Sequence, residues 1–191
     1  NLTSTYDYAS SDLPFNLWRF HFFGPCTANA YFAPAPDFAA AFESHDSNNN
    51  NSEIGDPSPL VSYISRNCRT QRDAWVRRLE SLLSVASLGK CLHNTAWPFP
   101  KASYPYWQEK VLVLRRYPFT LAIEGSDAPG KSGLVSEKLF DAFAAGTVPI
   151  YWGAPRHVVE RFAPSPRSFI HVDDFPKGLE QLAAYLARLA K

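Results

Sequence analysis

Charged and hydroxyl-bearing side chains gather in one short stretch of the chain. They are Glu124, Lys131, Ser132, Ser136, Glu137 and Lys138. A lysine beside the first turn of a helix attracts phosphate, because its charge acts together with the helix dipole and the free backbone N–H groups. A neighbouring carboxylate accepts hydrogen bonds from sugar hydroxyls. These residue types predict a site for a phosphorylated ligand.

The sequence around these residues predicts a strand, a loop, a helix and a second strand. Residues 119–123 and 148–152 are short apolar runs, which are typical of buried strands. Residues 125–133 contain three glycines and one proline, which indicate a loop. Apolar residues at helical spacing run from Leu134 to Phe143, and Gly146 is a helix stop. This unit predicts an α/β fold with a parallel sheet, whose ligands bind beyond the carboxyl ends of the strands.

One interpretation of the loop is a phosphate-binding P-loop. Residues 125–132 fit the pattern G-x-x-x-x-G-K-[ST], with Lys131 and Ser132 at its end, and they lie between a predicted strand and a predicted helix. Asp173 ends another apolar run and could hold Mg²⁺. The alternative function is therefore that of a P-loop ATPase or GTPase.

Four segments support a second interpretation. They are YPFTLAIE at 117–124, VSEKLF at 135–140, AGTVPIYWGAP at 145–155 and SFIHVDDF at 168–175. From about Leu60 onward the chain resembles the α1,3/α1,4-fucosyltransferases of glycosyltransferase family 10, which carry these segments in the same order. Four ordered segments are more specific than one eight-residue pattern, so we favour this interpretation over the P-loop.

The resemblance implies a Rossmann-like parallel sheet domain, the C-terminal half of a GT-B glycosyltransferase. It implies transfer of L-fucose from GDP-fucose, with inversion, to a GlcNAc-type hydroxyl of a glycan. No metal is expected to be obligatory, because Arg and Lys match the phosphates, although divalent cations could stimulate the reaction. A nucleotide-sugar-binding fragment that is catalytically incomplete is the remaining alternative.

The resemblance also assigns binding residues. The family carries its nucleotide on a Glu-Lys pair and on an upstream Arg, and an Arg at a helix start beyond a strand can fork two phosphate oxygens. The predicted nucleotide-binding set is Arg72, Glu124, Lys131, Ser136, Glu137 and Lys138. Leu134 stands where the family has Tyr, and Gly125 stands where it has Asn, so the choice of donor is left open.

The remaining elements follow from apolar spacing and from the resemblance. The predictions are a strand at 60–65, a helix at 73–85, a second strand with its exit turn at 88–94, a loop at 97–107, a lead-in segment at 109–116, a short helix at 155–162, a strand at 169–172 and an amphipathic helix at 177–190.

Three regions are expected. Residues 1–38 resemble a remnant of the acceptor-side N-terminal domain, 39–59 form a low-complexity linker or insertion with four consecutive Asn, and 60–191 form the GDP-fucose-binding domain. Sequons begin at Asn1 and Asn50. In this family a Glu of the first domain is the general base, which is expected upstream of this chain. No catalytic residue is therefore assigned, and we expect weak nucleotide binding and little or no sugar transfer by this chain alone.

Composition excludes several classes. The formal net charge of +1 gives no field that would favour nucleic acid. No apolar run approaches the ~20 residues of a membrane span, and the chain lacks Met. We expect part of a longer Golgi protein on the lumenal side of the membrane, held by an N-terminal anchor that is absent here. Of the three cysteines, Cys68 and Cys91 could bridge and leave Cys26 unpaired, or all three could be reduced.

Overall fold

The computed structural model describes residues 59–99, 106–125 and 134–190. The predicted N-terminal remnant, nearly all of the linker, both sequons, Cys26 and Lys131 lie outside these residues. Within them, no helix is both long and apolar enough to cross a membrane.

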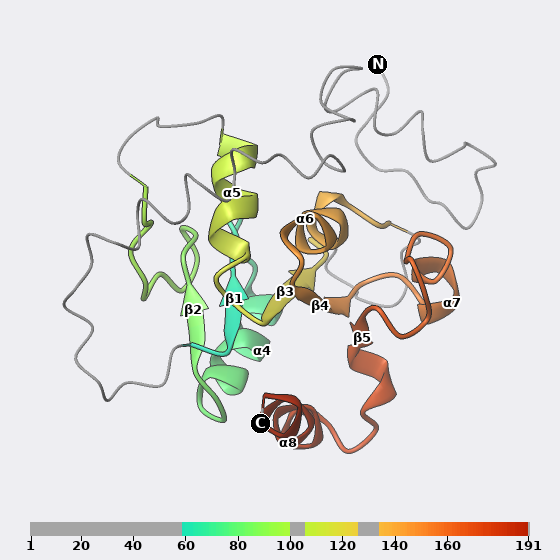
Figure 1. Cartoon of the computed structure of the whole chain (residues 1–191). Coiled ribbons are helices and arrows are strands. Elements are labelled where there is room, and N and C mark those ends of the chain that lie inside the picture. The colour runs from blue at the N-terminus through green and yellow to red at the C-terminus, as the bar shows by residue number, and fades with distance from the viewer. Residues whose placement is uncertain (1–58, 100–105, 126–133, 191) are drawn as a thin grey trace, which may run out of the picture. The chain divides into compact units, whose positions relative to one another are not determined.

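A parallel five-stranded sheet forms the centre of the described chain (Figure 1). Its strands are β1 (Val61–Tyr63), β2 (Val85–Ser87), β3 (Phe119–Ile123), β4 (Val148–Trp152) and β5 (Ile170–His171), in the order β2-β1-β3-β4-β5. All four pairings are parallel. Every residue of β1, β2, β3 and β5 is buried, as is usual in a parallel sheet that has helices on both faces. The prediction of an α/β fold with a Rossmann-like parallel sheet is confirmed.

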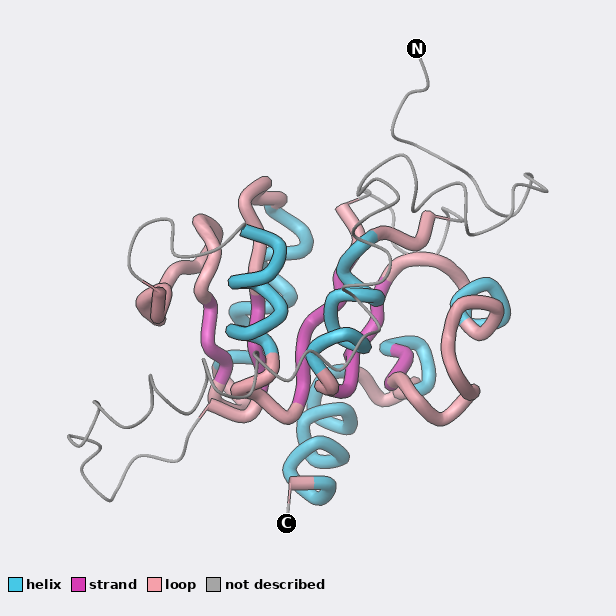
Figure 2. The backbone as a smooth tube through the Cα atoms, turned by 45° about the horizontal axis from the view of Figure 1, so that its top comes forward, coloured by secondary structure: helices cyan, strands magenta, loops and turns pink. Residues whose placement is uncertain are grey.

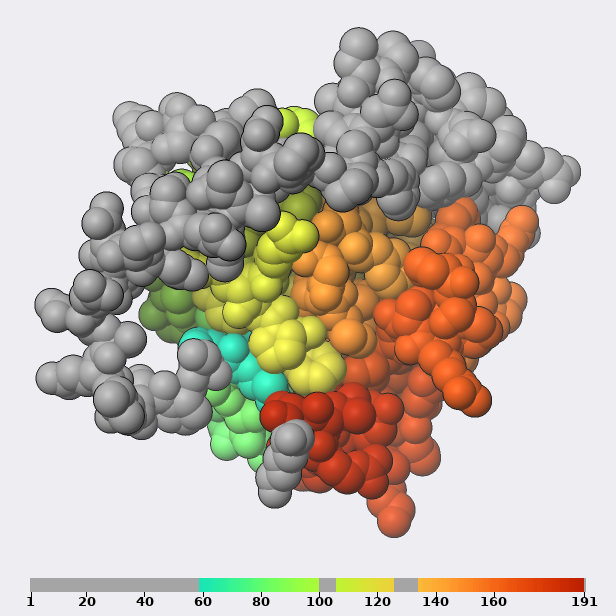
Figure 3. Space-filling model, viewed as in Figure 1, coloured from blue at the N-terminus to red at the C-terminus, as the bar shows by residue number. Residues whose placement is uncertain are grey.

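Helices cover both faces of this sheet (Figure 2). They are α4 (Thr70–Glu80), α5 (Tyr106–Leu114), α6 (Glu137–Ala145), α7 (Arg156–Val159), the 3₁₀ turn η1 (Val172–Asp174) and α8 (Leu179–Leu189). Helices α5 and α6 contact each other on one face, and α4 contacts α8 on the other. Figure 3 shows α8 lying against the segments around β1 and α4, where Arg78 pairs with Glu180. The domain is therefore doubly wound.

The strand order places a topological switch point between β1 and β3. The chain leaves β1 toward β2 and then crosses back to β3, so the connections after β1 and after β3 run in opposite directions. Doubly wound sheets bind ligands at this switch point, outside the carboxyl ends of the strands. The turns after Tyr63 and after Ile123 are consequently the places to look for a site.

Most predicted elements are confirmed with shorter bounds. The predicted helix stop at Gly146 is the left-handed residue that ends α6, with φ of 74°, a conformation that glycine adopts without strain. The predicted elements at 60–65, 155–162, 169–172 and 177–190 correspond to β1, α7, β5 and α8.

Around β2, one predicted helix has the wrong bounds and one predicted strand is a turn. The helix predicted at 73–85 begins at Thr70 and ends at Glu80, and Val85 opens β2 instead. The strand predicted at 88–94 is the turn after β2, which packs tightly: a Cβ on Gly89 would lie 2.4 Å from the backbone of Ser65. The apolar spacing misled because Leu82 and Leu83 continue the helical period in a loop.

Helix α5 was also missed. Part of it was predicted as a loop at 97–107 and part as a lead-in segment. Its apolar residues Leu112, Val113 and Leu114 are consecutive rather than spaced, and Glu109 is buried as well. The helix therefore shows no amphipathic pattern from which sequence could identify it.

A disulfide joins the turns after β1 and β2. Cys68 and Cys91 are bonded, with their Cα atoms 5.3 Å apart, which decides the question left open by the sequence. The Cys91 N–H donates to the Ser65 carbonyl at 3.1 Å. The bond therefore fixes the β1–α4 turn to its neighbour.

We expect the Cys68→Ser/Cys91→Ser variant to lose about 3 kcal/mol of unfolding free energy, because the bond closes a loop with a sequence separation of 23. Urea unfolding with and without reductant measures this loss. Reductant should destabilise the native chain and leave the double variant unchanged; equal stability of the native chain in both conditions would contradict the prediction.

A buried ion pair joins α5 to α6. Lys110 Nζ lies 2.5 Å from Asp141 Oδ2, with side-chain exposures of 13% and 3%. Burial lowers the pKa of the Lys110 ammonium, but the charge and hydrogen bond of Asp141 outweigh burial and raise it above its ordinary value. The stabilisation from this pair is complete below the ordinary pKa of lysine and is lost as the pH rises through the raised pKa.

We expect Lys110→Met to cost about 3 kcal/mol or more, because it leaves the buried Asp141 carboxylate without its ammonium partner. Adding Asp141→Leu to that variant removes the uncompensated charge and should recover much of the loss. Chemical denaturation of the single and double variants measures both effects. A double variant less stable than the single one would contradict this explanation.

Candidate functional site

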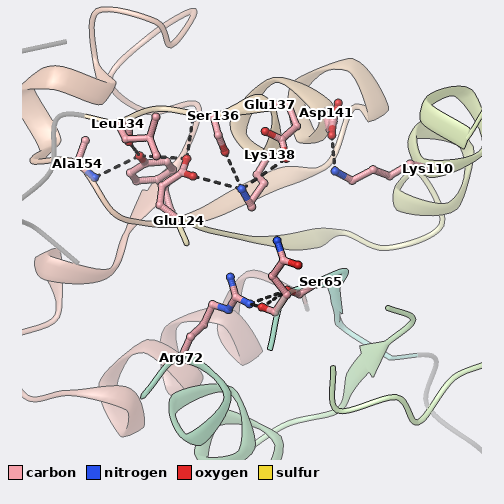
Figure 4. A network of polar contacts seen from close by, with 12 residues as sticks. Ser65, Arg72, Lys110, Glu124, Leu134, Ser136, Glu137, Lys138, Asp141 and Ala154 are labelled. Atoms are coloured by element: carbon pink, nitrogen blue, oxygen red, sulfur yellow. Dashed lines mark hydrogen bonds and ion pairs between the residues drawn. The ribbon is translucent and has the colours of Figure 1, made fainter. Parts of the chain in front are cut away.

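Glu124 is the centre of a polar group at the end of β3 (Figure 4). Its residue surface is 2% exposed. Oε1 accepts the Ser136 backbone N–H at 2.8 Å, and Oε2 accepts from Lys138 Nζ at 3.3 Å. The carboxylate thus ties the end of β3 to the start of α6, across the loop that contains the P-loop pattern.

Lys138 lies in the first turn of α6, where it was predicted. Its Nζ donates to Ser136 Oγ at 2.8 Å and lies 3.5 Å from Glu137 Oε1. Its side chain is 23% exposed, whereas that of Glu124 is 1% exposed. The ammonium therefore lies between a buried carboxylate and solvent, and it can reach a ligand at the edge of the sheet.

Tyr151 and Gly153, at the end of β4, pack against the Glu124 side chain. The buried Tyr151 hydroxyl donates to the Leu134 carbonyl at 2.9 Å and accepts the Ala154 N–H at 3.2 Å. Burial, together with the nearby negative charge of Glu124, raises the pKa of Tyr151 well above its ordinary value, so this hydroxyl stays protonated. A Cβ on Gly153 would lie 2.5 Å from Glu124 Cγ, so only glycine allows this approach.

Glu137 is the more accessible carboxylate, with 41% side-chain exposure. Burial of part of the group raises its pKa, but the charges of Lys138 and Lys110 outweigh burial and lower it. Glu137 is therefore ionised at neutral pH, and an ionised carboxylate accepts stronger hydrogen bonds from sugar hydroxyls than a neutral carboxyl group does.

Arg72 forms a second polar group, at the turn after β1. It lies in the first turn of α4, where it was predicted, and it is 6% exposed. Its Nη2 donates to Ser65 Oγ at 2.6 Å and to the Asn67 carbonyl. Its Nε is buried without a hydrogen-bond partner and lies 3.8 Å from Asp73 Oδ1. This guanidinium still has hydrogen-bonding capacity that its protein neighbours do not use.

The structure brings the predicted residues into two groups, one at each side of the switch point. Glu124, Ser136, Glu137 and Lys138 contact one another after β3, and Arg72 lies after the neighbouring β1. Among the described residues, no hydrogen bond or ion pair joins the two groups. Lys131 is not described.

Sequence reasoning missed the residues that support these groups: Ser65, Asn67, Tyr151 and Gly153. Tyr151 and Gly153 fall in the resembling segment at 145–155, where Tyr151 was noted only as part of an apolar strand. Its hydroxyl is important because β4 ends beside Glu124, as the pairing of Ile123 with Trp152 shows. Strand order was the missing information.

The described residues include one group with metal-ligand spacing. Ligand atoms of Cys68, Asp73 and Cys91 lie within 4.8 Å of one another, but the two sulfurs are joined as a disulfide and offer no thiolate. Asp173, the acid of the P-loop interpretation, is 62% exposed and lies 3.7 Å from His171 Nδ1. Asp173 lies in η1, after β5, and β4 lies between β5 and β3 in the sheet.

Known proteins with similar sequences are fucosyltransferases. The chain is 35% identical over 140 residues to GDP-fucose protein O-fucosyltransferase 3 of Xenopus laevis, covering 70% of this chain and 28% of the relative. It is 38% identical over 130 residues to alpha-(1,3)-fucosyltransferase 4 of Bos taurus, covering 66% and 29%. The chain therefore spans less than a third of the length of these relatives.

Solved structures are similar as well. A crystal structure of an alpha1,3-fucosyltransferase with GDP superposes with a TM-score of 0.53 at 27% identity, covering 69% of this chain and 34% of that one. Another, with GDP-fucose, gives a TM-score of 0.52 at 27% identity, covering 69% and 35%. Residues 57–191 match the family model described as "Glycosyltransferase family 10 (fucosyltransferase) C-term". The chain thus belongs to glycosyltransferase family 10, the fucosyltransferases, and its sheet domain is of the kind that forms the C-terminal part of a GT-B enzyme.

Proposed function

We propose that residues 60–191 bind GDP-fucose, and that the whole protein transfers L-fucose from it, with inversion, to a GlcNAc-type hydroxyl of a glycan. One observation carries this proposal. Lys138, at the start of α6, and the buried Arg72, at the turn after β1, lie on the two sides of the switch point between β1 and β3.

Each of these groups suits one part of the donor. Lys138 offers a charge and α6 offers a helix N-terminus to the diphosphate. Arg72 adds donors from the β1 side, and an Arg-Lys pair balances the diphosphate charge without an obligatory metal, although divalent cations could stimulate. Glu137 accepts from the ribose hydroxyls. The relatives with GDP and with GDP-fucose support this choice of nucleotide.

The acceptor and the linkage are proposed on the names of the relatives. Alpha-(1,3)- and alpha-(1,4)-fucosyltransferases are among them, and so are protein O-fucosyltransferases. We favour a GlcNAc-type hydroxyl as acceptor, because the four resembling segments are those of the α1,3/α1,4 enzymes, and the α1,3 type, because two of these relatives are alpha-(1,3)-fucosyltransferases. The inverting step needs a carboxylate that deprotonates the acceptor hydroxyl as GDP leaves, and this carboxylate is placed in the acceptor-side domain.

The lumen of the Golgi is the proposed compartment, with the membrane reached through an N-terminal anchor. The bond between Cys68 and Cys91 supports this proposal. Such bonds persist in oxidising compartments and are rare in the cytosol.

We expect calorimetric titration of the purified chain to show GDP and GDP-fucose binding that needs no Mg²⁺, and no binding of ATP with Mg²⁺. Lys138→Met should weaken GDP binding by about 30-fold or more, because a hydrogen bond to a charged group contributes about 2 kcal/mol. Lys177→Ala, at an exposed lysine just before α8, is the control and should bind GDP as the native chain does.

Two results would contradict the proposal. Mg²⁺-dependent ATP binding that Lys131→Ala abolishes would restore the P-loop interpretation. Equal GDP binding by the native chain and Lys138→Met would remove the phosphate role of Lys138.

A further inference from the structure

Glu124 is too deeply buried to contact a ligand directly. One oxygen accepts the Ser136 N–H at 2.8 Å and lies 3.5 Å from the Tyr151 hydroxyl. The other accepts from Lys138 Nζ at 3.3 Å. The side chain is 1% exposed. A group so enclosed acts on a ligand through its neighbours.

Lys138 needs such a neighbour. A cation in the first turn of a helix is disfavoured by the helix dipole, which carries partial positive charge at that end. Three oxygens surround the ammonium, from Ser136, Glu124 and Glu137, at 2.8, 3.3 and 3.5 Å. Of the two carboxylates, only that of Glu124 is buried and held by further contacts. It is therefore the fixed point from which Lys138 is oriented.

The position of Glu124 is itself over-determined. The Gly153 backbone fits against its side chain with no room for a methyl group, since a Cβ there would lie 2.5 Å from Cγ and 2.9 Å from Cβ of Glu124. Tyr151 fills the space behind, and its own hydroxyl is fixed by the Leu134 carbonyl and the Ala154 N–H. These contacts restrict the carboxylate to one position, and that position determines where the Lys138 ammonium lies.

We propose that Glu124 is a positioning residue, which holds the Lys138 ammonium and the start of α6 in the geometry that receives the donor diphosphate without touching the donor itself. This inference rests on the proposed function of the site. It differs from the sequence-based prediction, which placed Glu124 among the residues that contact the nucleotide.

The first test is the sign of the effect of Glu124→Gln on GDP affinity. The amide can accept the Ser136 N–H or face Lys138 with its oxygen, but it cannot do both, because its other end is a donor. Positioning therefore predicts roughly tenfold weaker GDP binding. Removing a negative charge beside the site would by itself strengthen the binding of an anion, so unchanged or tighter binding overturns the proposal.

A double-variant cycle separates positioning from direct contact. If Glu124 acts by holding Lys138 and the start of α6, then Glu124→Gln weakens GDP binding less in a Lys138→Met chain than in the native chain, because only its hold on the Ser136 N–H is left to lose. If Glu124 touches GDP itself, the two losses multiply, and that result overturns the proposal.

A glycine variant moves the carboxylate without changing its charge. Gly153→Ala forces Glu124 to shift, because a Cβ there would lie 2.5 Å from Glu124 Cγ. We expect Gly153→Ala to weaken GDP binding several-fold and the control Lys177→Ala to leave it unchanged. Thermal unfolding of each variant confirms that it is folded before its affinity is compared.

A measurement without nucleotide judges the proposal separately from the proposed function. In ¹⁵N-lysine-labelled protein, the Lys138 ammonium, assigned through Lys138→Met, should give a slowly exchanging, ordered signal that Glu124→Gln abolishes and the control Lys177→Ala keeps. An ordered signal in folded Glu124→Gln would overturn the positioning role. A native chain with an ordered ammonium but no affinity for GDP would contradict only the proposed function.

Discussion

The contact between the Glu124 carboxylate and the start of α6 is the constraint on which the site depends. Glu124 directly follows β3, and Ser136 is the residue before α6, so this contact fixes the strand, the helix and the two ends of the loop between them. A buried carboxylate is costly unless every oxygen has a donor. Here the backbone N–H of Ser136 and the ammonium of Lys138 supply those donors. Because losing either donor would destabilise the buried carboxylate, both groups are held in fixed positions.

The polar group on the β1 side of the switch point is held in place by other interactions. There the Arg72 guanidinium is held by Ser65 and by the Asn67 carbonyl, within a turn that the Cys68–Cys91 bond fixes to the turn after β2. One side of the site thus uses a partly buried ion pair and the other a covalent bond. The reversal of strand order between β1 and β3 brings these two distant parts of the sequence together at the carboxyl edge of the sheet.

The central strand–helix–strand unit was predictable from sequence, because its strands are largely apolar runs of five residues, and glycine occurs within two residues of the end of each. The β2 region was not, because a three-residue strand follows a helix whose apolar spacing continues into a loop. Helix α5 was hidden because it buries polar groups such as Glu109 and Lys110. Among the site residues, sequence located Arg72, Glu137 and Lys138 on the right elements, whereas the close fit of Gly153 against Glu124 depends on tertiary contacts.

A crystal structure of the chain with GDP tests the central claim most directly. The account predicts the diphosphate at the carboxyl edge of β1 and β3, within hydrogen-bonding distance of Lys138 Nζ and the Arg72 guanidinium, with Glu124 still buried on Ser136 and Lys138. A diphosphate enclosed by the loop at residues 125–132, with Lys138 and Arg72 not in contact with it, would contradict the account.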